Sequence, residues 1–406
     1  MSAPHEHHGQ AVIKYHARLV RPVGAPDVEN GTVAVEGGTI AYVGARASAP
    51  PGSDVELGDV VLAPGLVNAH THLDLTVLRG RFDGLPFFDW IRALTAARAA
   101  LLPDELAESA RAGIREGLRA GITTYADTAP NDAPLEAMRE AGVRGIAYRE
   151  VFGPDPAQCE RSMEGLRAAI AAMRPRETAL VRAGVSPHAP YSVSDDLFRE
   201  VARLAIAERL PLATHVAESA DESEYVTRGE GGFAGFLRSR GIAVRARGRT
   251  PVELLDRCGV LAAEALLIHC VRCDGPDIAT IAQRDAAVAA CPMSNRYFAH
   301  GAAPVAGLRR ARVRVGAGSD SMASNTRMDI LAEARAALGA GAAERDVWEL
   351  ATLGGARALR LDHAIGSLEP GKQADLAAFP LGADPDAPSS AGFVAVAGRV
   401  LVGGAT

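Results

Sequence analysis

Two histidines separated by one residue end an apolar stretch, Pro64-Gly-Leu-Val-Asn-Ala-His-Thr-His72. Side chains two residues apart on a β-strand point to the same face, so a strand here places His70 beside His72. Two imidazoles that meet at the end of a buried strand can begin a metal site. The next question is which residues elsewhere in the chain complete it.

Further apolar runs also end in residues that bind metals or move protons. Including the first pair, five of the eleven histidines lie at such ends. A lone histidine in such a place is more often a core residue than a ligand. Five on one rim, together with two carboxylates, favour a functional site. The additional residues are His188, His215, Glu218, His269 and Asp320.

Three imidazoles and one carboxylate that leave a position open for water are typical of a catalytic metal site. The assigned ligands are His70, His72, His215 and Asp320. A metal lowers the pKa of bound water to about 7, and Glu218 lies near enough to carry the released proton to a substrate. His269 is assigned to hydrogen-bond the hydroxide or a developing oxyanion, and a purely supporting role for this buried histidine is the competing interpretation. The catalytic set is Glu218, His269 and Asp320.

The lysines bear on the number of metals. Many two-metal hydrolase barrels bridge their metals with a carboxylated lysine on a barrel strand. Only Lys14 and Lys372 occur in this chain, and both lie near its ends. One divalent metal is therefore expected, and the ligand types alone do not fix which ion it is.

These residues need a scaffold that brings strand ends together. Apolar runs alternate with Ala/Leu/Arg-rich segments such as residues 104–120, 195–209 and 274–284. Eight strands alternating with helices over roughly 300 residues fit a (β/α)8 barrel, whose active site lies at the carboxyl ends of the strands. A doubly wound open sheet is the alternative, but no Gly-rich phosphate loop follows the first strand. The predicted strands are Val60–His72, Ile122–Asp127, Gly145–Val151, Val181–Pro187, Leu212–Glu218, Leu266–Cys270, Ala287–Cys291 and Val313–Asp320.

Both ends of the chain are predicted to form β-structure. Residues 31–44 alternate around Gly37-Gly38, which is typical of a hairpin. Residues 375–379 and 393–402 are strand-like runs separated by a loop rich in Pro, Asp and Ser. Two β segments at opposite ends of a chain can pair into one small sheet unit beside the middle part.

Composition limits the class of protein. Hydrophobic residues make up 48% and charged residues 23%, which is ordinary for a globular protein. The net charge of −6 gives no attraction to nucleic acid or to an anionic membrane. No apolar run reaches the ~18–20 residues of a membrane span, and Met1–Gln10 has no apolar signal core.

The five cysteines favour a cytoplasmic protein. An odd number in a long chain indicates free thiols in a reducing compartment. Cys270 and Cys273 have the C-x-x-C spacing, but no second pair lies nearby. A structural or incidental role is therefore preferred over a zinc knuckle or a redox site.

Together these motifs resemble the amidohydrolase superfamily. The resemblance covers essentially the whole chain. Within the superfamily, the chain is most similar to the cytosine/adenosine-type deaminases and the triazine chlorohydrolases. Among the deaminases it resembles those of methylthioadenosine, S-adenosylhomocysteine and aminodeoxyfutalosine. The motif set is highly specific for the superfamily and much less so for the substrate. The motifs are P-G-x-V-N-x-H-x-H, S-P-H-x-P-Y, H-V-A-E, the sixth-strand histidine, C-P-x-S-N, G-S-D-S-x-A-S-N and Gly366–Asp375.

The resemblance implies an architecture and a reaction. We expect a distorted (β/α)8 barrel at residues 64–363 and a composite β-sandwich formed by residues 1–63 and 364–406. The implied cofactor is one divalent metal, zinc or alternatively iron, bound by the four assigned ligands. The implied reaction is attack of hydroxide on an amidine-like ring carbon with loss of ammonia. The family often forms homodimers, although nothing in this sequence marks an interface.

Substrate contacts also follow from the resemblance. Asp83 stands where methylthioadenosine and S-adenosylhomocysteine deaminases use a glutamate to hold ribose hydroxyls, and its shorter side chain weakens that match. Arg149 and His188 match positions that contact the nucleoside or its substituent. Ser324 matches a serine just after the metal-binding aspartate.

The segment Leu85–Ile91 resembles the aminodeoxyfutalosine deaminases, which serve menaquinone synthesis. Its aromatic residues, Phe87, Phe88 and Trp90, are expected both to wall the substrate pocket and to pack a covering helix on the barrel. The leading hypothesis is therefore hydrolytic removal of the 6-amino group from an adenine nucleoside with a 5′ substituent.

Other functions remain as alternatives. The enzyme alternatives are deamination of methylthioadenosine, S-adenosylhomocysteine, guanine, a pterin or cytosine, and triazine dechlorination. The non-enzyme alternative is a decayed barrel that only binds metal, because fold does not dictate function. Decay should have damaged some of the six metal and catalytic residues, and none is missing.

Overall fold

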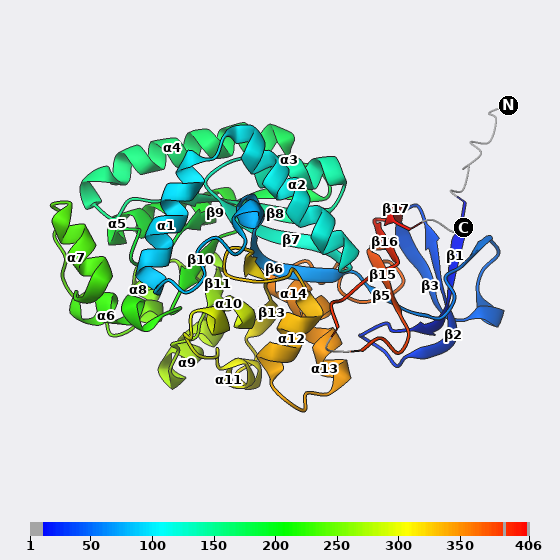
Figure 1. Cartoon of the computed structure of the whole chain (residues 1–406). Helices are drawn as coiled ribbons and strands as arrows, with labels where there is room; N and C mark the ends of the chain where they lie inside the picture. Colours follow the sequence, from blue (N-terminus) through cyan, green and yellow to red (C-terminus); the bar gives the residue numbers. More distant parts are fainter. Residues whose placement is uncertain (1–10, 385–386, 404–406) are drawn as a thin grey trace.

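The computed structural model describes residues 11–384 and 387–403, so the prediction about Met1–Gln10 lies outside the described residues. Figure 1 shows a large part built of alternating strands and helices and, beside it, a smaller part built of strands. None of the described helices is both long enough and apolar enough to cross a membrane.

The smaller part is the predicted β-sandwich. Its strands run in the order β17-β16-β15-β5-β1-β2-β3, with β4 paired to β1. Strands from both ends of the chain share it, since β5 pairs antiparallel with β15 and Leu62 lies opposite Ala378. Both residues belong to one buried apolar cluster with Tyr15 and Phe393. The predicted pairing of the terminal segments is confirmed. The strands are β1 (Ile13–Val20), β2 (Val28–Glu36), β3 (Thr39–Ala45), β4 (Ser53–Glu56), β5 (Val60–Pro64), β15 (Leu376–Pro380), β16 (Phe393–Val396) and β17 (Arg399–Val402).

Two hairpins shape this sheet. Gly37 and Gly38 both have positive φ and connect β2 to β3, which confirms the first predicted hairpin. The run 393–402 is not one strand, because Ala397 and Gly398 adopt φ of 46° and 76° and turn β16 back onto β17. The alternating apolar pattern continues through this turn and hides it in the sequence.

The larger part is a distorted (β/α)8 barrel, as predicted. Its parallel strands form two arcs, β14-β6-β7-β8-β9 and β10-β11-β12-β13. A bridge between Val185 and Leu212 joins β9 to the segment entering β10. At the other junction, β14 follows β13 after two residues and pairs with β6. The strands are β6 (Leu66–His72), β7 (Ile122–Ala129), β8 (Arg144–Val151), β9 (Val181–Pro187), β10 (Ala213–Val216), β11 (Leu266–His269), β12 (Ala287–Ala290), β13 (Arg314–Ala317) and β14 (Asp320–Ser321).

The helices connect the barrel strands around the outside (Figure 1). Helix α1 differs, because its aromatic residues contact the segments that follow β9 and β12. It therefore covers the carboxyl ends of the strands. The α-helices are α1 (Phe87–Ala100), α2 (Pro103–Arg119), α3 (Ala133–Ala141), α4 (Cys159–Met173), α5 (Asp195–Glu208), α6 (Ala220–Arg228), α7 (Gly231–Ser239), α8 (Pro251–Arg257), α9 (Gly275–Gln283), α10 (Pro292–Tyr297), α11 (Val305–Arg310), α12 (Ile330–Leu338), α13 (Glu344–Glu349) and α14 (Gly355–Ala358).

Two predicted strands are divided in the structure. Val60–His72 leaves the sandwich after β5 and enters the barrel as β6, with the break at Gly65. A Cβ at Gly65 would lie 2.1 Å from the Thr123 hydroxyl, so only glycine fits where the two parts meet. Val313–Asp320 divides into β13 and β14 around Gly318, whose absent Cβ leaves room for His70. The proposed domain boundaries at residues 63/64 and 363/364 stay a prediction.

The barrel interior below the site is filled by apolar side chains that alternate along the strands. Ile146 and Tyr148 on β8 belong to this cluster together with Ile268 on β11. The same alternation directs Glu150, two residues after Tyr148, toward the barrel axis and Arg149 away from it. Side chains above this apolar layer form the site.

Candidate active site

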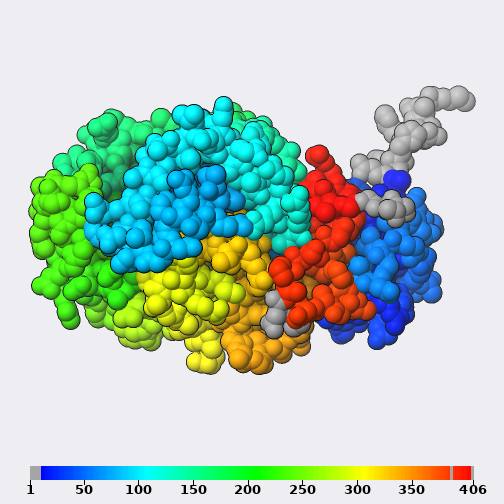
Figure 2. Space-filling model, in the orientation of Figure 1, coloured from blue at the N-terminus to red at the C-terminus, as the bar shows by residue number. Residues whose placement is uncertain are grey.

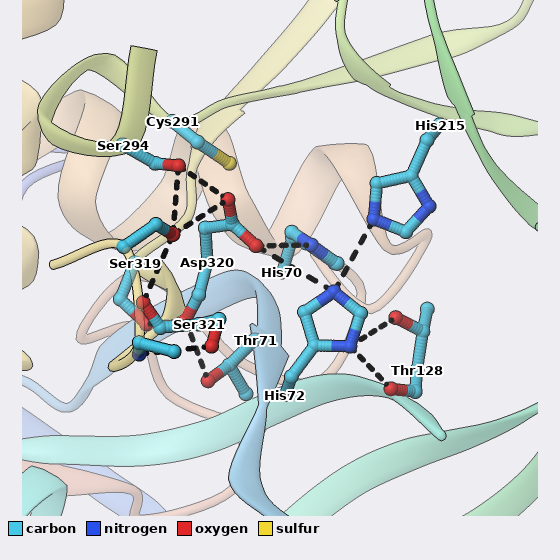
Figure 3. A network of polar contacts seen from close by, with 12 residues as sticks. His70, Thr71, His72, Thr128, His215, Cys291, Ser294, Ser319, Asp320 and Ser321 are labelled. Atoms are coloured by element: carbon cyan, nitrogen blue, oxygen red, sulfur yellow. Dashed lines mark hydrogen bonds and ion pairs between the residues drawn. The ribbon is translucent and has the colours of Figure 1, made fainter. Parts of the chain in front are cut away.

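The five strand-end histidines lie together. The His70 ring centroid is 4.8 Å from that of His72 and 4.9 Å from that of His215. His215 lies 4.8 Å from His188 and 5.6 Å from His269 by the same measure. Figure 3 shows His70, His72 and His215 pointing toward one another and toward Asp320. The structure therefore brings together all four residues assigned as ligands.

Backbone carbonyls fix the orientation of two of these rings. His72 Nδ1 lies 2.7 Å from the Thr128 carbonyl oxygen, and His215 Nδ1 lies 3.2 Å from the His188 carbonyl oxygen. A carbonyl only accepts hydrogen bonds, so both Nδ1 atoms are protonated and both Nε2 atoms carry a lone pair. Metal-binding histidines are commonly held in this way.

The spacing of the facing atoms fits a metal. The Nε2 atoms of His72 and His215 are 3.3 Å apart, and Asp320 Oδ1 lies 3.3 Å from His70 Nε2 and 3.5 Å from His72 Nε2. Ligands 2.0–2.1 Å from a tetrahedral zinc ion are about 3.3–3.4 Å apart. Two lone pairs that face each other at this distance need a cation between them. The donor set therefore suits one divalent ion.

Asp320 is held by hydroxyl groups on its other oxygen. Ser294 donates to Oδ2 at 2.5 Å, and Ser324 donates to the same oxygen at 3.4 Å. Burial alone would raise the pKa of Asp320, but the neighbouring imidazoles of His70, His269 and His72 hold that pKa well below its ordinary value. The carboxylate is thus ionised and available as a ligand.

His269 is oriented by the C-P-x-S-N motif. Its Nδ1 lies 3.0 Å from the side-chain oxygen of Asn295, so Nε2 faces the site. That Nε2 atom lies 3.7 Å from Glu218 Oε1 and 3.9 Å from Asp320 Oδ2. His269 therefore stands between the two carboxyl groups, where it can contact a polar atom bound between them.

The backbone next to Glu218 adopts a strained conformation. Ala217 has φ of 53°, in the left-handed region that non-glycine residues seldom adopt. Both carboxyl oxygens of Glu222 on α6 accept hydrogen bonds from this turn, from the Ala217 and Glu218 amides at 2.8 Å each. His269 and Asp320 also have positive φ, at 75° and 55°. Backbone strain of this kind often gathers at functional sites.

The environment of Glu218 favours the protonated form of its carboxyl group. Burial raises the pKa of Glu218 well above its ordinary value, and the charges of Asp320 and Glu222 add to the effect. A carboxylic acid with a raised pKa is suited to donate a proton near neutral pH.

Of the four predicted substrate contacts, His188 and Ser324 lie at the site. His188 Nδ1 is 2.7 Å from the Ser192 hydroxyl, and its ring packs 4.9 Å from Phe152. Burial lowers the pKa of His188 to about 3, so the ring is neutral. The Ser324 hydroxyl donates to Asp320 and accepts a hydrogen bond from Ser294, so it supports the ligand cluster.

The other two predicted contacts are not brought to the site. Arg149 donates to the Pro130 carbonyl at 2.5 Å and forms an ion pair with Asp132, on the outer side of β8. Asp83 is exposed and accepts a hydrogen bond from Tyr297 at 2.8 Å. Spacing along the strand could not tell the inward residue, Glu150, from its outward neighbour.

Glu150 belongs to a buried ionic network beside the site. Arg98 of α1 donates to Asp74 at 2.6 Å and lies 3.4 Å from Glu150. Burial raises the pKa of Glu150 to about 7. One oxygen of each carboxyl group is buried without a hydrogen-bond partner among the described residues. Residue spacing carries no signal for this network, because Arg98 belongs to a separate helix.

Aromatic residues line the space beside the clustered histidines. Phe87 lies 6.5 Å from Tyr191, 5.0 Å from Phe298 and 4.6 Å from His300 between ring centroids. Tyr191 stacks on Phe233 of α7 at 4.1 Å. Figure 2 shows the light-blue surface around α1 adjoining the yellow surface near residue 300. The predicted packing role of α1 fits these contacts.

The thiols take no part in this cluster. All five cysteines are free in the structure. Cys270 is buried next to His269, and Cys273 is partly buried. The structural or incidental role expected for the C-x-x-C pair stays a prediction.

The amidohydrolase family model matches residues 61–403 of this chain. The chain belongs to the amidohydrolase family. It is 33% identical over 381 residues to the 5-methylthioadenosine/S-adenosylhomocysteine deaminase of Moorella thermoacetica, covering 87% of this chain and 82% of that protein. It is also 33% identical over 366 residues to the 5′-deoxyadenosine deaminase of Methanothermobacter thermautotrophicus, covering 87% and 81%.

Solved amidohydrolase structures have the same fold. An adenosine deaminase from Xanthomonas campestris with bound zinc is 30% identical, with a TM-score of 0.84 over 96% of this chain and 93% of that one. The aminofutalosine deaminase of Helicobacter pylori, in complex with methylthio-coformycin, is 22% identical, with a TM-score of 0.85 over 96% and 100%. The family match and the deaminase relatives identify this amidohydrolase as an enzyme, a hydrolytic deaminase.

Proposed function

We propose that this amidohydrolase removes the 6-amino group of an adenine nucleoside that carries a bulky, aminodeoxyfutalosine-like 5′ substituent. The observation that carries the proposal is the position of Glu218 Oε1, 3.7 Å from His269 Nε2 and beside the four clustered ligands. The relatives at 33% identity act on adenine nucleosides, which supports the same base here. An aminodeoxyfutalosine substrate would assign the enzyme to menaquinone biosynthesis.

One divalent metal, for which we propose zinc, would be held by the four clustered ligands and would supply hydroxide at neutral pH by lowering the pKa of water. Water replaces the amine overall: a C6–O bond forms, the C6–N bond breaks and ammonia leaves. Glu218 donates its proton to the ring nitrogen beside C6 as negative charge develops there. The same carboxyl then receives a proton that originates from the water and passes it to the departing amine.

His269 and His188 have different roles in this proposal. His269, held by Asn295, contacts the oxygen that adds to C6 and stabilises charge on it. His188, kept neutral by burial, would contact the sugar of the nucleoside with its ring. Both roles need only the ring orientations already fixed by neighbouring side chains.

The bulky 5′ substituent is proposed from an apolar surface beside His188. Phe152 is 41% exposed at the end of β8 and packs against the His188 ring. Large apolar side chains are commonly buried, and an exposed ring at a pocket rim can receive an apolar ligand. A 5′ group with an aromatic ring would cover it.

A smaller 5′ group is the second candidate. It is favoured by the relatives named for 5-methylthioadenosine and 5′-deoxyadenosine. The two candidates share the base chemistry and differ in how much of Phe152 they cover. Guanine, pterins, cytosine and triazines lack the ribose and are the wider alternatives.

The test is ammonia release by zinc-loaded enzyme from adenosine, methylthioadenosine, S-adenosylhomocysteine and aminodeoxyfutalosine, with the four wider alternatives as further substrates. We expect the highest kcat/KM for aminodeoxyfutalosine. Phe152→Ala should lower that preference, while Phe236→Ala, at another exposed ring, should not. Ammonia from guanine or a pterin but from no adenosine derivative would overturn the proposal.

A further inference from the structure

His300 is a second histidine beside the proton-transferring carboxyl. Its Nε2 atom lies 3.7 Å from Glu218 Oε1, the same distance that separates His269 Nε2 from that oxygen. The two rings come from different segments, since His269 ends β11 and His300 lies in the loop after α10. One carboxyl oxygen therefore faces two imidazoles.

The loop holds His300 in place. The His300 amide donates to the Asn295 carbonyl at 2.9 Å, and its ring stacks on Phe298 at 5.2 Å and meets the edge of Phe87 at 4.6 Å. The preceding residue, Ala299, has φ of 55°, a left-handed conformation that costs strain in a residue other than glycine. The His300 side chain is only 7% exposed.

The Nε2 atom of His300 is buried without a hydrogen-bond partner among the described residues. A buried polar atom without a partner costs free energy and calls for an explanation. The facing carboxyl oxygen of Glu218 is 3.7 Å away, just beyond hydrogen-bond length. Contacts of this kind often shorten only when the substrate is bound.

We propose that His300 is a positioning residue for Glu218: its Nε2–H donates to Glu218 Oε1 in the substrate complex, which leaves Oε2 to carry the transferred proton. The inference rests on the proposed role of Glu218. A carboxyl group has two oxygens that can exchange roles by rotation. A donor fixed on one of them keeps the acidic proton on the other.

Two substitutions separate this role from simple packing. His300→Phe keeps an aromatic ring between Phe87 and Phe298 but removes the N–H group. His300→Gln loses the ring but places an amide N–H near the position of Nε2. We expect His300→Phe to lower kcat by about 10- to 100-fold with KM changed less than about threefold, because misplaced catalytic groups cost this much.

The conservative variant gives the contrast. His300→Gln should keep kcat within about threefold of wild type, since a positioned N–H is what the proposal requires. If His300→Phe is fully active and His300→Gln is impaired, the residue only packs, and the proposal is overturned. Equal loss in both variants overturns it as well, because the amide would then fail to replace the imidazole.

A spectroscopic readout does not depend on finding the substrate. In zinc-loaded enzyme with 15N-labelled histidine and with methylthio-coformycin bound in place of substrate, the Nε2 resonance of His300 is the one absent from His300→Phe. Glu218→Gln should shift that resonance and leave the resonance of exposed His363 unchanged. An unshifted His300 resonance overturns the inference, whereas failure of every adenine nucleoside to release ammonia overturns the proposed function alone.

Discussion

At the scale of single residues, the pKa values of the proton-transferring carboxyl and of the ligand carboxylate are shifted in opposite directions. Burial raises the pKa of Glu218, while the neighbouring imidazoles hold the pKa of Asp320 well below its ordinary value. Two carboxyl groups whose environments push their pKa values apart can serve as acid and as ligand in one small site. The difference comes from contacts and not from residue type.

Replacing the acid should separate chemistry from metal binding. Glu218→Gln keeps the size of the side chain but cannot transfer a proton, so kcat should fall by about 10²–10⁴-fold. Zinc content per chain should stay the same, because Glu218 is not among the clustered ligands. Glu164→Gln, on the exposed side of α4, is the matched control and should match wild type. Unchanged turnover in Glu218→Gln would remove it as proton carrier.

The Ser294 hydroxyl, which donates to Asp320, should strengthen metal binding. Ser294→Ala removes the donor that lies 2.5 Å from Oδ2, and such outer contacts are worth about 10–100-fold in metal affinity. Competition with a chelator would measure the loss. Ser239→Ala, which removes a surface hydroxyl at the end of α7, should leave zinc affinity unchanged. Equal affinities for wild type and Ser294→Ala would contradict the assigned role of Asp320.

At the scale of elements, the site depends on a covering helix attached by a buried ion pair. Arg98 links α1 to Asp74 after β6 and to Glu150 on β8. Removing one partner of a buried pair leaves an uncompensated charge and costs about 3–5 kcal/mol. Arg98→Met should therefore lower the melting temperature, and adding Asp74→Asn should recover much of the loss. No recovery in the double variant would show that the pair does not hold α1.

A second element-scale prediction concerns pH. Glu333 on α12 accepts from the Met293 amide and from Asn325, and burial raises the pKa of Glu333 to about 8. An acid whose pKa is raised by folding is protonated at no cost below about pH 4.5, and its ionisation opposes folding as the pH rises toward 8. Stability should therefore fall across this window.

Glu333→Gln removes that titration. The free energy of unfolding of Glu333→Gln minus that of wild type should increase from pH 5 to pH 8, because only wild type loses stability in this range; urea titration at each pH measures it. Glu344→Gln, at an exposed position on α13, should show no such trend. A pH-independent difference between Glu333→Gln and wild type would contradict the assignment.

The strand-end residues could be predicted from the sequence, because the carboxyl ends of all strands of a parallel barrel lie at the same end of the barrel. The sequence could not show which of the adjacent residues Arg149 and Glu150 on β8 faces the barrel axis, because the pleat of the strand decides this. Sequence reasoning also missed Arg98 and His300, which reach the site from a helix and a loop, and it included Asn295 in a motif without assigning it a role. Spacing along one segment carries no information about contacts between segments.

At the scale of the whole molecule, barrel and sandwich are joined by more than the chain. Arg144 at the start of β8 makes two hydrogen bonds, of 2.8 and 3.0 Å, to Asp375 beside β15, and both side chains are buried. Asp375 also accepts from the Ala397 amide. This ion pair ties the base of the barrel to the turn of the last hairpin.

Breaking it should uncouple the two parts. Arg144→Met leaves Asp375 buried and unpaired, which costs about 3–5 kcal/mol. We expect one heat-capacity peak for wild type and two for Arg144→Met, while Arg182→Met, at an exposed position on the next strand, keeps one. Two peaks in the wild-type protein would show that the ion pair does not couple the parts.

The most direct test of the account is zinc titration of metal-stripped enzyme while ammonia release from its best adenine nucleoside is followed. The clustered ligands and the absence of a lysine in the barrel predict a rate that rises linearly to one equivalent of zinc per chain and then stays constant. Full activity in the stripped enzyme, or a rate that rises to two equivalents, would contradict a single-metal hydrolytic deaminase.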